Sequence, residues 1–296
     1  MLEAKNMNKP SRQQKAQFLT MLAVIIIIAL LLSGTTIFSM VHRFQTKPRP
    51  DSYSQSIRSS QTTKAPDHSS SYHNLPTKEQ ATYAFMSAKN ELKTDGTYNN
   101  HGAYVLNNNQ STLTVKNNMH EYAANTTDSK GRPGVANAFL TKHSRQYKNR
   151  EQTNNGRTNW TPQGWHQMSN LPGTYKYAYN RGHLLGYALV GNIRGFDASE
   201  SNHKNIIAQT MWANQANTAN NTGQNYYEGL VRKALDHNKK VRYQVKPIYD
   251  ANNVVPYGVQ MQAKSTDNTL NFNVFVPNIQ GNINIDYTDG SVNPNY

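Results

Sequence analysis

An arginine, a glycine and a histidine stand together in the stretch YNRGHLLG at 179–186. A histidine titrates near neutral pH, so His183 could take a proton from an attacking water molecule. Arg181, two residues earlier, would share a face with it in an extended segment and could hold a phosphate through paired hydrogen bonds. Gly182 would leave room for a substrate backbone to approach. On this tripeptide alone, a turn with an exposed histidine and arginine is an equally good interpretation.

Asparagines are concentrated in the segment SNHKNIIAQTMWANQANT at 201–218. Asn205, Asn214 and Asn217 all lie there, downstream of the histidine. Amide oxygens are hard, neutral ligands of the kind that suits Mg²⁺, which keeps most of its own water molecules. Such a metal could offset charge that builds up on a phosphate and on its leaving oxygen. Asparagine is also common in loops, so each of these residues is weak support when taken alone.

Glu228 and Arg232 are four residues apart, which places them on one face of a helix. An exposed salt bridge is the commoner interpretation of such a pair. The alternative is that Glu228 orders water at a metal while Arg232 faces a phosphate. With His183 and the asparagines, the chain then holds a base, a metal ligand, a water-orienting acid and charge-stabilising arginines. One-metal hydrolysis of a phosphodiester requires this set.

The elements that must position these residues can be predicted from their apolar spacing. A strand leading into a loop is expected over 176–186, a second short strand over 205–210, and a helix over 222–238. Three later segments alternate between apolar and polar residues and predict strands: 241–249, 257–263 and 271–278. This order of elements predicts an α+β domain with a mainly antiparallel sheet.

Further upstream, the pattern predicts a helix from Thr77 to about Leu92 and a strand, turn and strand over 102–115. Residues 125–160 read as a loop that is rich in positive charge. Its cations are Lys130, Arg132, Lys142, Arg145, Lys148, Arg150 and Arg157. A solvated surface is the ordinary explanation for isolated charges of this kind.

The chain as a whole is basic, with 31 Lys and Arg against 17 Asp and Glu and a formal net charge of +14. This balance favours a polyanionic partner: nucleic acid, an anionic membrane or a wall polymer. The chain contains no cysteine, which excludes disulfides, thiol catalysis and cysteine-based metal sites.

The N-terminal part predicts attachment to a membrane. Residues 18–41 form one uncharged apolar stretch, and about 20 helical residues are enough to cross a bilayer. The basic residues before it predict that 1–17 are a cytoplasmic tail and that the rest lies outside the cell. A cleaved signal peptide is the competing interpretation, but the apolar run is long and no clear cleavage site follows. Residues 42–76 are polar and predict a flexible extracellular linker, where a protease could release the folded domain at 77–296.

The segments NRGHLLGYALVGNIRGFDASESNHKNIIAQTMWANQAN and TGQNYYEGLVRKAL resemble the DNA/RNA non-specific endonucleases with a ββα-metal (His-Me finger) core. The similarity is greatest to the membrane-anchored, competence-type nucleases of Gram-positive bacteria, and DSKGRPGVANAFLTKH at 128–143 matches an upstream block of that branch. The resemblance implies a ββα-metal core, preceded here by a single transmembrane helix. It also implies an Mg²⁺-dependent enzyme, for which Mn²⁺ can substitute, that hydrolyses DNA and RNA without sequence preference and leaves 5′-phosphates.

The resemblance also implies roles for individual residues. His183 matches the general base, and Arg181 matches the arginine that helps to hold the phosphate. Asn214 matches the asparagine that binds Mg²⁺ directly. Asn205 matches an asparagine that helps to position the substrate and the scissile group.

Glu228 matches the acid that orients water at the metal, and Arg232 the arginine one turn further on. Arg150 is the best match for an upstream arginine that contacts the substrate. The family motif is Asp-Arg-Gly-His, and its first position is Asn180 here, which we assign with Arg150 to substrate binding. The change removes a negative charge beside the histidine, so activity or its pH optimum could differ, although an amide can still hold the local turn.

Two other functions compete with the endonuclease. A cell-surface receptor that binds DNA without cutting it would need the same anchor, linker and positive charge, and Asn180 would suit it. A pure binder, however, has no need for the intact set of histidine, asparagine and glutamate. Attachment to anionic wall polymers explains the charge but not the motif. We therefore predict a surface-anchored endonuclease.

Overall fold

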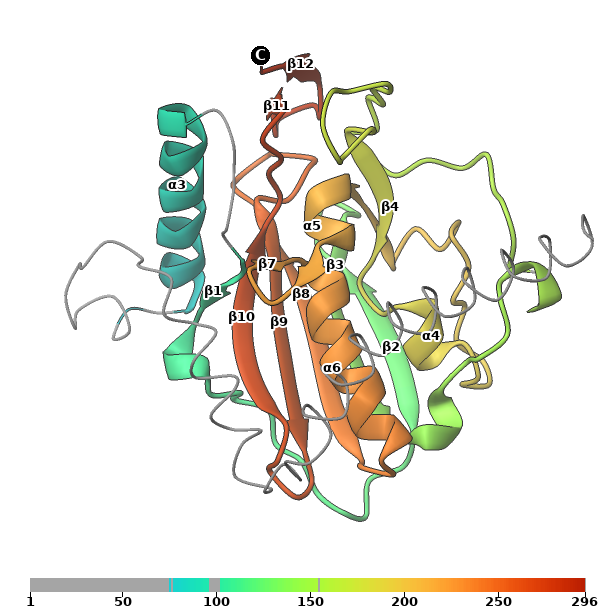
Figure 1. The fold of residues 1–296 in the computed structure, drawn as a ribbon. Coiled ribbons are helices and arrows are strands. Elements are labelled where there is room, and N and C mark those ends of the chain that lie inside the picture. Colours follow the sequence, from blue (N-terminus) through green and yellow to red (C-terminus); the bar gives the residue numbers. More distant parts are fainter. Residues whose placement is uncertain (1–74, 76, 96–101, 154, 296) are drawn as a thin grey trace, which may run out of the picture. The chain divides into compact units, whose positions relative to one another are not determined.

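A six-stranded antiparallel sheet organises the part of the chain described by the computed structural model, namely residues 75, 77–95, 102–153 and 155–295. The strand order is β1-β10-β9-β8-β3-β2. These strands are β1 (Tyr104–Val105), β2 (Tyr122–Thr127), β3 (Pro133–Leu140), β8 (Val241–Ile248), β9 (Gly258–Ser265) and β10 (Asn271–Pro277). β3 pairs with β8 although a long segment separates them in sequence, and that segment carries the candidate site (Figure 1).

The two faces of this sheet differ because side chains alternate along each strand. On one face, a cross-strand row is apolar and buried: Ala138, Tyr243, Ala263 and Phe272. On the other face, the adjacent row consists of amides: Asn137, Gln244, Gln262 and Asn273. Neighbouring amides bond to one another, as where Gln244 Nε2 donates to Asn137 Oδ1 at 2.9 Å. The apolar face is therefore the one that helices can cover.

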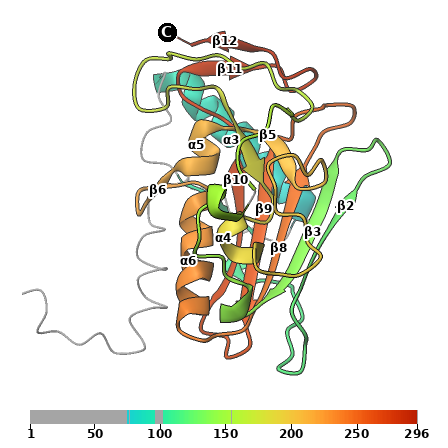
Figure 2. The same cartoon turned by 90° about the vertical axis from the view of Figure 1, so that its right-hand side faces the viewer.

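Helix α6 (Gln224–Asp236) packs on the apolar face. Its buried residues Tyr227, Val231 and Leu235 recur at helical spacing, and the ring of Tyr227 lies 5.2 Å from that of Phe272. Figures 1 and 2 show α6 laid along this face, with the short helices α4 (Tyr187–Val190) and α5 (Met211–Gln215) on the same side of the sheet.

Strands β4 (Tyr179–His183) and β5 (Ile206–Thr210) form a separate antiparallel ribbon. The ribbon is followed in sequence by α5 and α6. Two antiparallel strands and a helix are the succession expected of a ββα core, and the α+β class with a mainly antiparallel sheet is confirmed.

The remaining elements surround this arrangement. Helix α3 (Thr77–Asp95) contacts β10, and the ring of Phe85 stacks on that of Tyr257 at 4.2 Å. The remaining strands are short: β6 (Asn217–Thr218), β7 (Asn221–Thr222), β11 (Ile283–Ile285) and β12 (Val292–Pro294). The 3-10 helices are η2 (Asn107–Asn109), η3 (Lys142–Ser144) and η4 (Glu151–Thr153).

Most predicted elements are confirmed, but the prediction of a loop over 125–160 is wrong for its first part, up to Leu140. β3 lies inside that range and is bonded on both sides, to β2 and to β8. Its sequence PGVANAFL combines proline, glycine, asparagine and small alanines, which have little preference for strands. Pairing with two neighbours, rather than local preference, makes this segment a strand.

The strand, turn and strand predicted over 102–115 is only partly right. The structure has the short β1 and the 3-10 helix η2, and then no second strand. The backbone N–H of Ser111 donates to Asn271 Oδ1, and that of Thr112 donates to Gln262 Oε1. Side-chain amides of the sheet thus take the hydrogen bonds that a further strand would have used.

The predicted tail (1–17) and transmembrane segment (18–41) lie outside the described residues, and so does the predicted linker (42–76) apart from Leu75. Within the described part of the chain, no helix is long and apolar enough to cross a membrane.

Candidate active site

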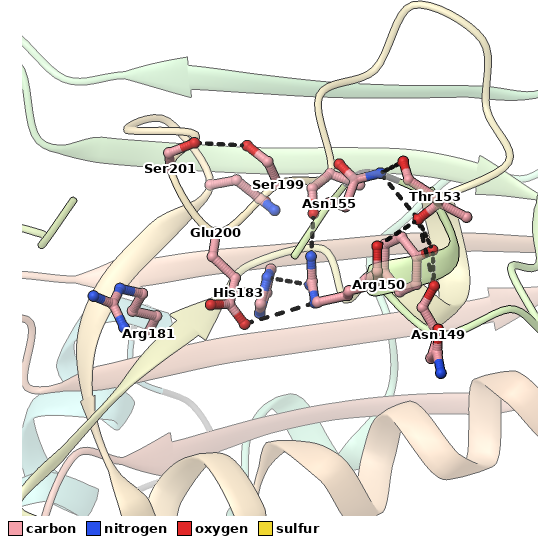
Figure 3. A network of polar contacts seen from close by, with 12 residues as sticks. Asn149, Arg150, Thr153, Asn155, Arg181, His183, Ser199, Glu200 and Ser201 are labelled. Atoms are coloured by element: carbon pink, nitrogen blue, oxygen red, sulfur yellow. Dashed lines mark hydrogen bonds and ion pairs between the residues drawn. The ribbon is translucent and has the colours of Figure 1, made fainter. Parts of the chain in front are cut away.

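His183 is the last residue of β4, and its imidazole faces the guanidinium of Arg150 (Figure 3). Arg150 Nη2 lies 2.6 Å from His183 Nε2. A guanidinium can only donate, so Nε2 accepts and the imidazole is neutral with its proton on Nδ1. Withdrawal from water, reinforced by the positive charge of Arg150, lowers the pKa of His183 to about 3. At neutral pH the ring is therefore in the form that can accept a proton.

Arg150 is held in place by the loop before β5 and by α4. Its Nη1 donates to the carbonyl oxygen of Ala198 at 2.9 Å, and its Nε lies 3.7 Å from Glu200 Oε1. The guanidinium carbon also lies 4.4 Å from the centre of the Tyr187 ring. The arginine predicted to contact substrate is thus placed beside the predicted base, with most of its side chain withdrawn from solvent.

The Glu228–Arg232 pair is not an exposed salt bridge. Glu228 is only 9% exposed, and its Oε2 lies 3.4 Å from Arg232 Nη1. Its Oε1 accepts a hydrogen bond from Gln224 Nε2 at 3.0 Å. Loss of solvation raises the pKa of Glu228, and the hydrogen bond from Gln224 and the charge of Arg232 oppose that rise. A carboxylate held in this way is shielded from bulk water but remains hydrogen-bonded.

Gly186 brings the segment that follows His183 against this carboxylate. A Cβ at position 186 would lie 2.6 Å from Glu228 Oε2 and 2.8 Å from Oε1. The backbone angles of Gly186 are ordinary, with φ −66° and ψ 137°. Glycine is therefore required here for close approach and not for an unusual backbone conformation.

Asn205 is fully buried and bonds to the backbone of Leu185, in the segment that follows His183. Its Oδ1 accepts from the backbone N–H of Leu185 at 2.9 Å and from Asn125 Nδ2 at 2.8 Å, while its Nδ2 donates to the Leu185 carbonyl at 3.0 Å. Both polar atoms of the amide are engaged. Any influence of Asn205 on the substrate would therefore pass through the backbone after His183.

Arg181 lies on β4 but its guanidinium is turned away from Arg150 (Figure 3). Its Nε donates to the carbonyl of Trp160 at 2.8 Å, and its Nη2 donates to that of Thr158 at 3.1 Å. In this arrangement Arg181 fixes the 158–160 backbone beside the site.

The expectation that Gly182 leaves room for substrate is wrong. Gly182 is buried, and a Cβ there would collide with the side chain of Gln209 on β5. The glycine of the NRGH motif therefore makes room for a neighbouring glutamine and not for a ligand.

Asn214 and Asn180 contrast with Asn205. Both are partly exposed, and neither side chain makes a hydrogen bond to any other described residue. Asn214 lies on α5, which is anchored by Trp212. The backbone N–H of Trp212 donates to Gln280 Oε1 at 2.9 Å, and the residue is only 2% exposed. α5 in turn packs against α6. Asn214 is thus an uncommitted amide on a firmly held helix.

The basic segment before the site is largely committed to protein contacts. Arg132 pairs with Asp128 at 2.7 Å, and Arg145 pairs with Asp236 at 2.8 Å. Within the described residues, three of its cations are exposed and have side chains that form no hydrogen bond or ion pair: Lys142, Lys148 and Arg157. These are the cations free to attract a polyanion.

Comparison with known proteins decides the family. The profile of the family described as DNA/RNA non-specific endonuclease matches residues 99–293. The chain belongs to the DNA/RNA non-specific endonuclease family. The protein is therefore an endonuclease, its substrate is nucleic acid, and the resemblance to this family is confirmed.

Solved structures agree with this assignment. The endonuclease is similar to NucA from Streptococcus agalactiae with a magnesium ion bound, at 45% identity and a TM-score of 0.64, over 70% of this chain and 96% of that one. It is also similar to the same nuclease with no metal bound, at 46% identity and a TM-score of 0.61, over 65% of this chain and 87% of that one.

The residues of the endonuclease fit a cation that brings most of its own ligands. Among the described residues, no group of three or more His, Cys, Asp and Glu could hold a metal ion. Asn214 offers one amide with no competing hydrogen bond, and Glu228 offers a buried carboxylate on the adjacent helix. Hard oxygen donors in small number suit Mg²⁺, which retains several water molecules when it binds.

Sequence reasoning missed two residues of this site, Gln224 and Gln209. Gln224 donates to the backbone oxygen of His183 and to Glu228, and it accepts from Gln209. A signal for Gln224 was present, because it lies one helical turn before Glu228 and so shares its face. No local signal marked Gln209, whose role depends on which strand lies beside it.

Proposed function

We propose that this endonuclease hydrolyses phosphodiester bonds of DNA and RNA without sequence preference, depends on Mg²⁺ and leaves 5′-phosphate ends. The single observation that carries the proposal is a neutral His183 whose backbone oxygen shares a hydrogen-bond donor, Gln224, with the buried Glu228. A base and an acid held by one amide suit the activation and orientation of one water molecule. The similarity to a nuclease solved with magnesium supports the choice of metal.

In the proposed mechanism, His183 takes a proton from water as the water attacks phosphorus. Its Nε2 lone pair faces Arg150, so the arginine must turn aside before the base can act. A phosphate is a stronger partner for a guanidinium than a neutral imidazole, because the hydrogen bonds to it are charge-assisted. Binding of the scissile phosphate would therefore draw Arg150 off the base and place its charge where negative charge develops.

The remaining residues would hold and orient the reacting groups. Asn214 would hold Mg²⁺, and Glu228 would accept hydrogen bonds from water at that site, oriented by Gln224 and Arg232. When bound, Mg²⁺ supplies positive charge that offsets the charge gained by the phosphate and by the departing 3′ oxygen. Asn180, whose side chain is also uncommitted, would face the substrate.

Attraction of the nucleic acid backbone would come from the exposed cations Lys142, Lys148 and Arg157. Contacts of this kind release counterions and are independent of sequence, so binding should weaken steeply as salt rises.

We also propose that the endonuclease acts outside the cell as a single-pass membrane protein. The support is the uncharged apolar stretch at 18–41 and its basic N-terminal flank. The polar segment 42–76 would tether the domain to the membrane.

The proposal is tested with the purified full-length chain and supercoiled circular DNA, with Mg²⁺ or with EDTA. We expect cutting that requires Mg²⁺, and a loss of at least about 10²-fold in turnover for His183→Ala with substrate binding kept. Normal turnover in that variant would exclude His183 as the base. Cutting at full rate in EDTA would exclude the metal, and labelling of product ends with a 5′-phosphate-specific ligase reports the polarity of cleavage.

A further inference from the structure

The site contains a buried chain of two glutamines that belongs to neither the base nor the acid. Gln209 on β5 is 1% exposed and Gln224 on α6 is 2% exposed. Gln209 Nε2 donates to Gln224 Oε1 at 3.1 Å. Gln224 Nε2 then donates to Glu228 Oε1 at 3.0 Å and to the backbone oxygen of His183. One amide therefore joins the end of the base-bearing strand to the acid-bearing helix.

Both amide hydrogens of Gln224 and its oxygen are engaged in this arrangement. Its amide nitrogen has two hydrogens, which match two acceptors on different elements, and its oxygen takes the hydrogen offered by Gln209. A flipped amide would set its oxygen against a carboxylate and a carbonyl, and its nitrogen against a donor. Gln209 therefore selects the orientation in which Gln224 can serve both partners.

Gln209 is itself fixed by the motif that contains the base. A Cβ at position 182 would collide with its side chain, so Gly182 is what admits Gln209 to this position. Gln209 Oε1 is buried and has no hydrogen-bond partner among the described residues. An orphaned buried acceptor has a cost in stability, so the packing against Gly182 and the hydrogen bond to Gln224 hold Gln209 here despite that cost.

We propose that Gln224 is a positioning residue of the endonuclease, which sets the distance and orientation between His183 and Glu228, and that Gln209 holds its amide in the working orientation. This inference rests on the proposed function of His183 and Glu228. His183 lies on β4 and Glu228 on α6, which are separate elements. A shift of the strand against the helix would misplace the attacking water, and Gln224 opposes such a shift. Donation from Gln224 also favours the ionised form of Glu228, against the effect of burial.

The test compares Gln224→Met with the wild-type full-length chain in the DNA-cutting assay. Methionine keeps the length of the side chain and removes all three hydrogen bonds. We expect kcat to fall about 10- to 100-fold, as for other residues that orient a metal site's partners. KM for DNA should stay within about twofold, and half-maximal activity should need more Mg²⁺.

Tyr243→Phe is the matched control. The Tyr243 hydroxyl is buried and has no hydrogen-bond partner among the described residues. Burial raises the pKa of Tyr243, and the nearby charge of Glu228 raises it further. Its removal should leave kcat unchanged. A purely structural role for Gln224 would instead lower the melting temperature of Gln224→Met while the folded fraction keeps wild-type kcat, and that result would overturn the proposal.

Gln209→Met provides a second and independent readout. It leaves both contacts of Gln224 in place but frees its amide to flip, so we expect a smaller loss of kcat in the same direction. In metal-free protein, the side-chain amide hydrogens of Gln224 should exchange slowly with solvent, and faster in Gln209→Met, as measured by NMR. Unchanged exchange together with unchanged kcat would overturn the proposal even if Gln224→Met does not fold. Failure of the proposed function can be told apart from failure of this inference. In the former case the wild-type protein would not cut DNA, or His183→Ala would cut it normally.

Discussion

Arg150 and His183 are 33 residues apart in sequence, yet their side chains meet at 2.6 Å between Nη2 and Nε2. The contact covers the lone pair that the base must use, and it places a positive charge beside an imidazole that is already withdrawn from water. Burial and this arginine together keep the base neutral, and in the proposed mechanism the arginine leaves the base only when a phosphate arrives.

This relationship makes a prediction about pH. The pKa of His183 is lowered from an ordinary value of 6.5 to about 3, first by desolvation and then by Arg150. Arg150→Ala removes the second cause, so the pKa should rise but stay below 6.5. The base works only above its pKa, so the acidic limb of the kcat/KM–pH profile, which reports the free enzyme, should move to higher pH. A limb that stays in place in this variant would show that Arg150 does not act on the base.

Asn214 makes no side-chain hydrogen bond to any other described residue, whereas the Asn205 amide is fully bonded, so we expect Asn214 to be the metal ligand. Asn214→Ala should weaken Mg²⁺ binding in titration calorimetry and lower kcat by at least about 100-fold. Loss of a residue that only supports a metal ligand already lowers metal affinity or activity about 10- to 100-fold. Asn217→Ala is the control, because Asn217 is an exposed amide three residues further along. It should bind Mg²⁺ as wild type does. Equal affinities in all three proteins would remove Asn214 from the metal site.

A different result is expected for the buried asparagine. Asn205→Ala leaves the backbone N–H and carbonyl of Leu185 without their partner, so the free energy of unfolding should fall by about 2–3 kcal/mol. KM for DNA in the folded protein should change little. Urea unfolding and steady-state kinetics distinguish this from direct contact with substrate, which would raise KM and leave stability intact.

The close approach of Gly186 to Glu228 predicts that a single methyl group disturbs the acid. Gly186→Ala should lower kcat by about 10-fold or more while the protein stays folded, since the added Cβ displaces the Glu228 carboxylate. The control is Gly156→Ala, where a Cβ would meet nothing within 4 Å and φ is not positive. We expect wild-type kcat from the control. Equal activity of the two variants would show that the carboxylate can move without consequence.

Predictions from the sequence succeeded where the signal was local. The helix that carries Glu228 and Arg232 follows from apolar residues at helical spacing, and the strands around His183 and after 205 follow from short apolar runs. The prediction failed at β3, because alanine, asparagine and glycine have little strand preference of their own and the pairing partner β8 is about a hundred residues away in sequence.

By itself, the sequence determined the family and the residue types available for chemistry, since NRGH, the downstream asparagines and the Glu–Arg spacing are contiguous patterns. It could not determine which of them are free to act. Tertiary structure committed Arg181 to the 158–160 backbone and Asn205 to Leu185, left Asn214 uncommitted, and brought Arg150 onto the base. The physical reason is that hydrogen-bond capacity is finite: whether an arginine or an amide can serve a ligand depends on which carbonyls and amides the fold brings within hydrogen-bonding distance of it.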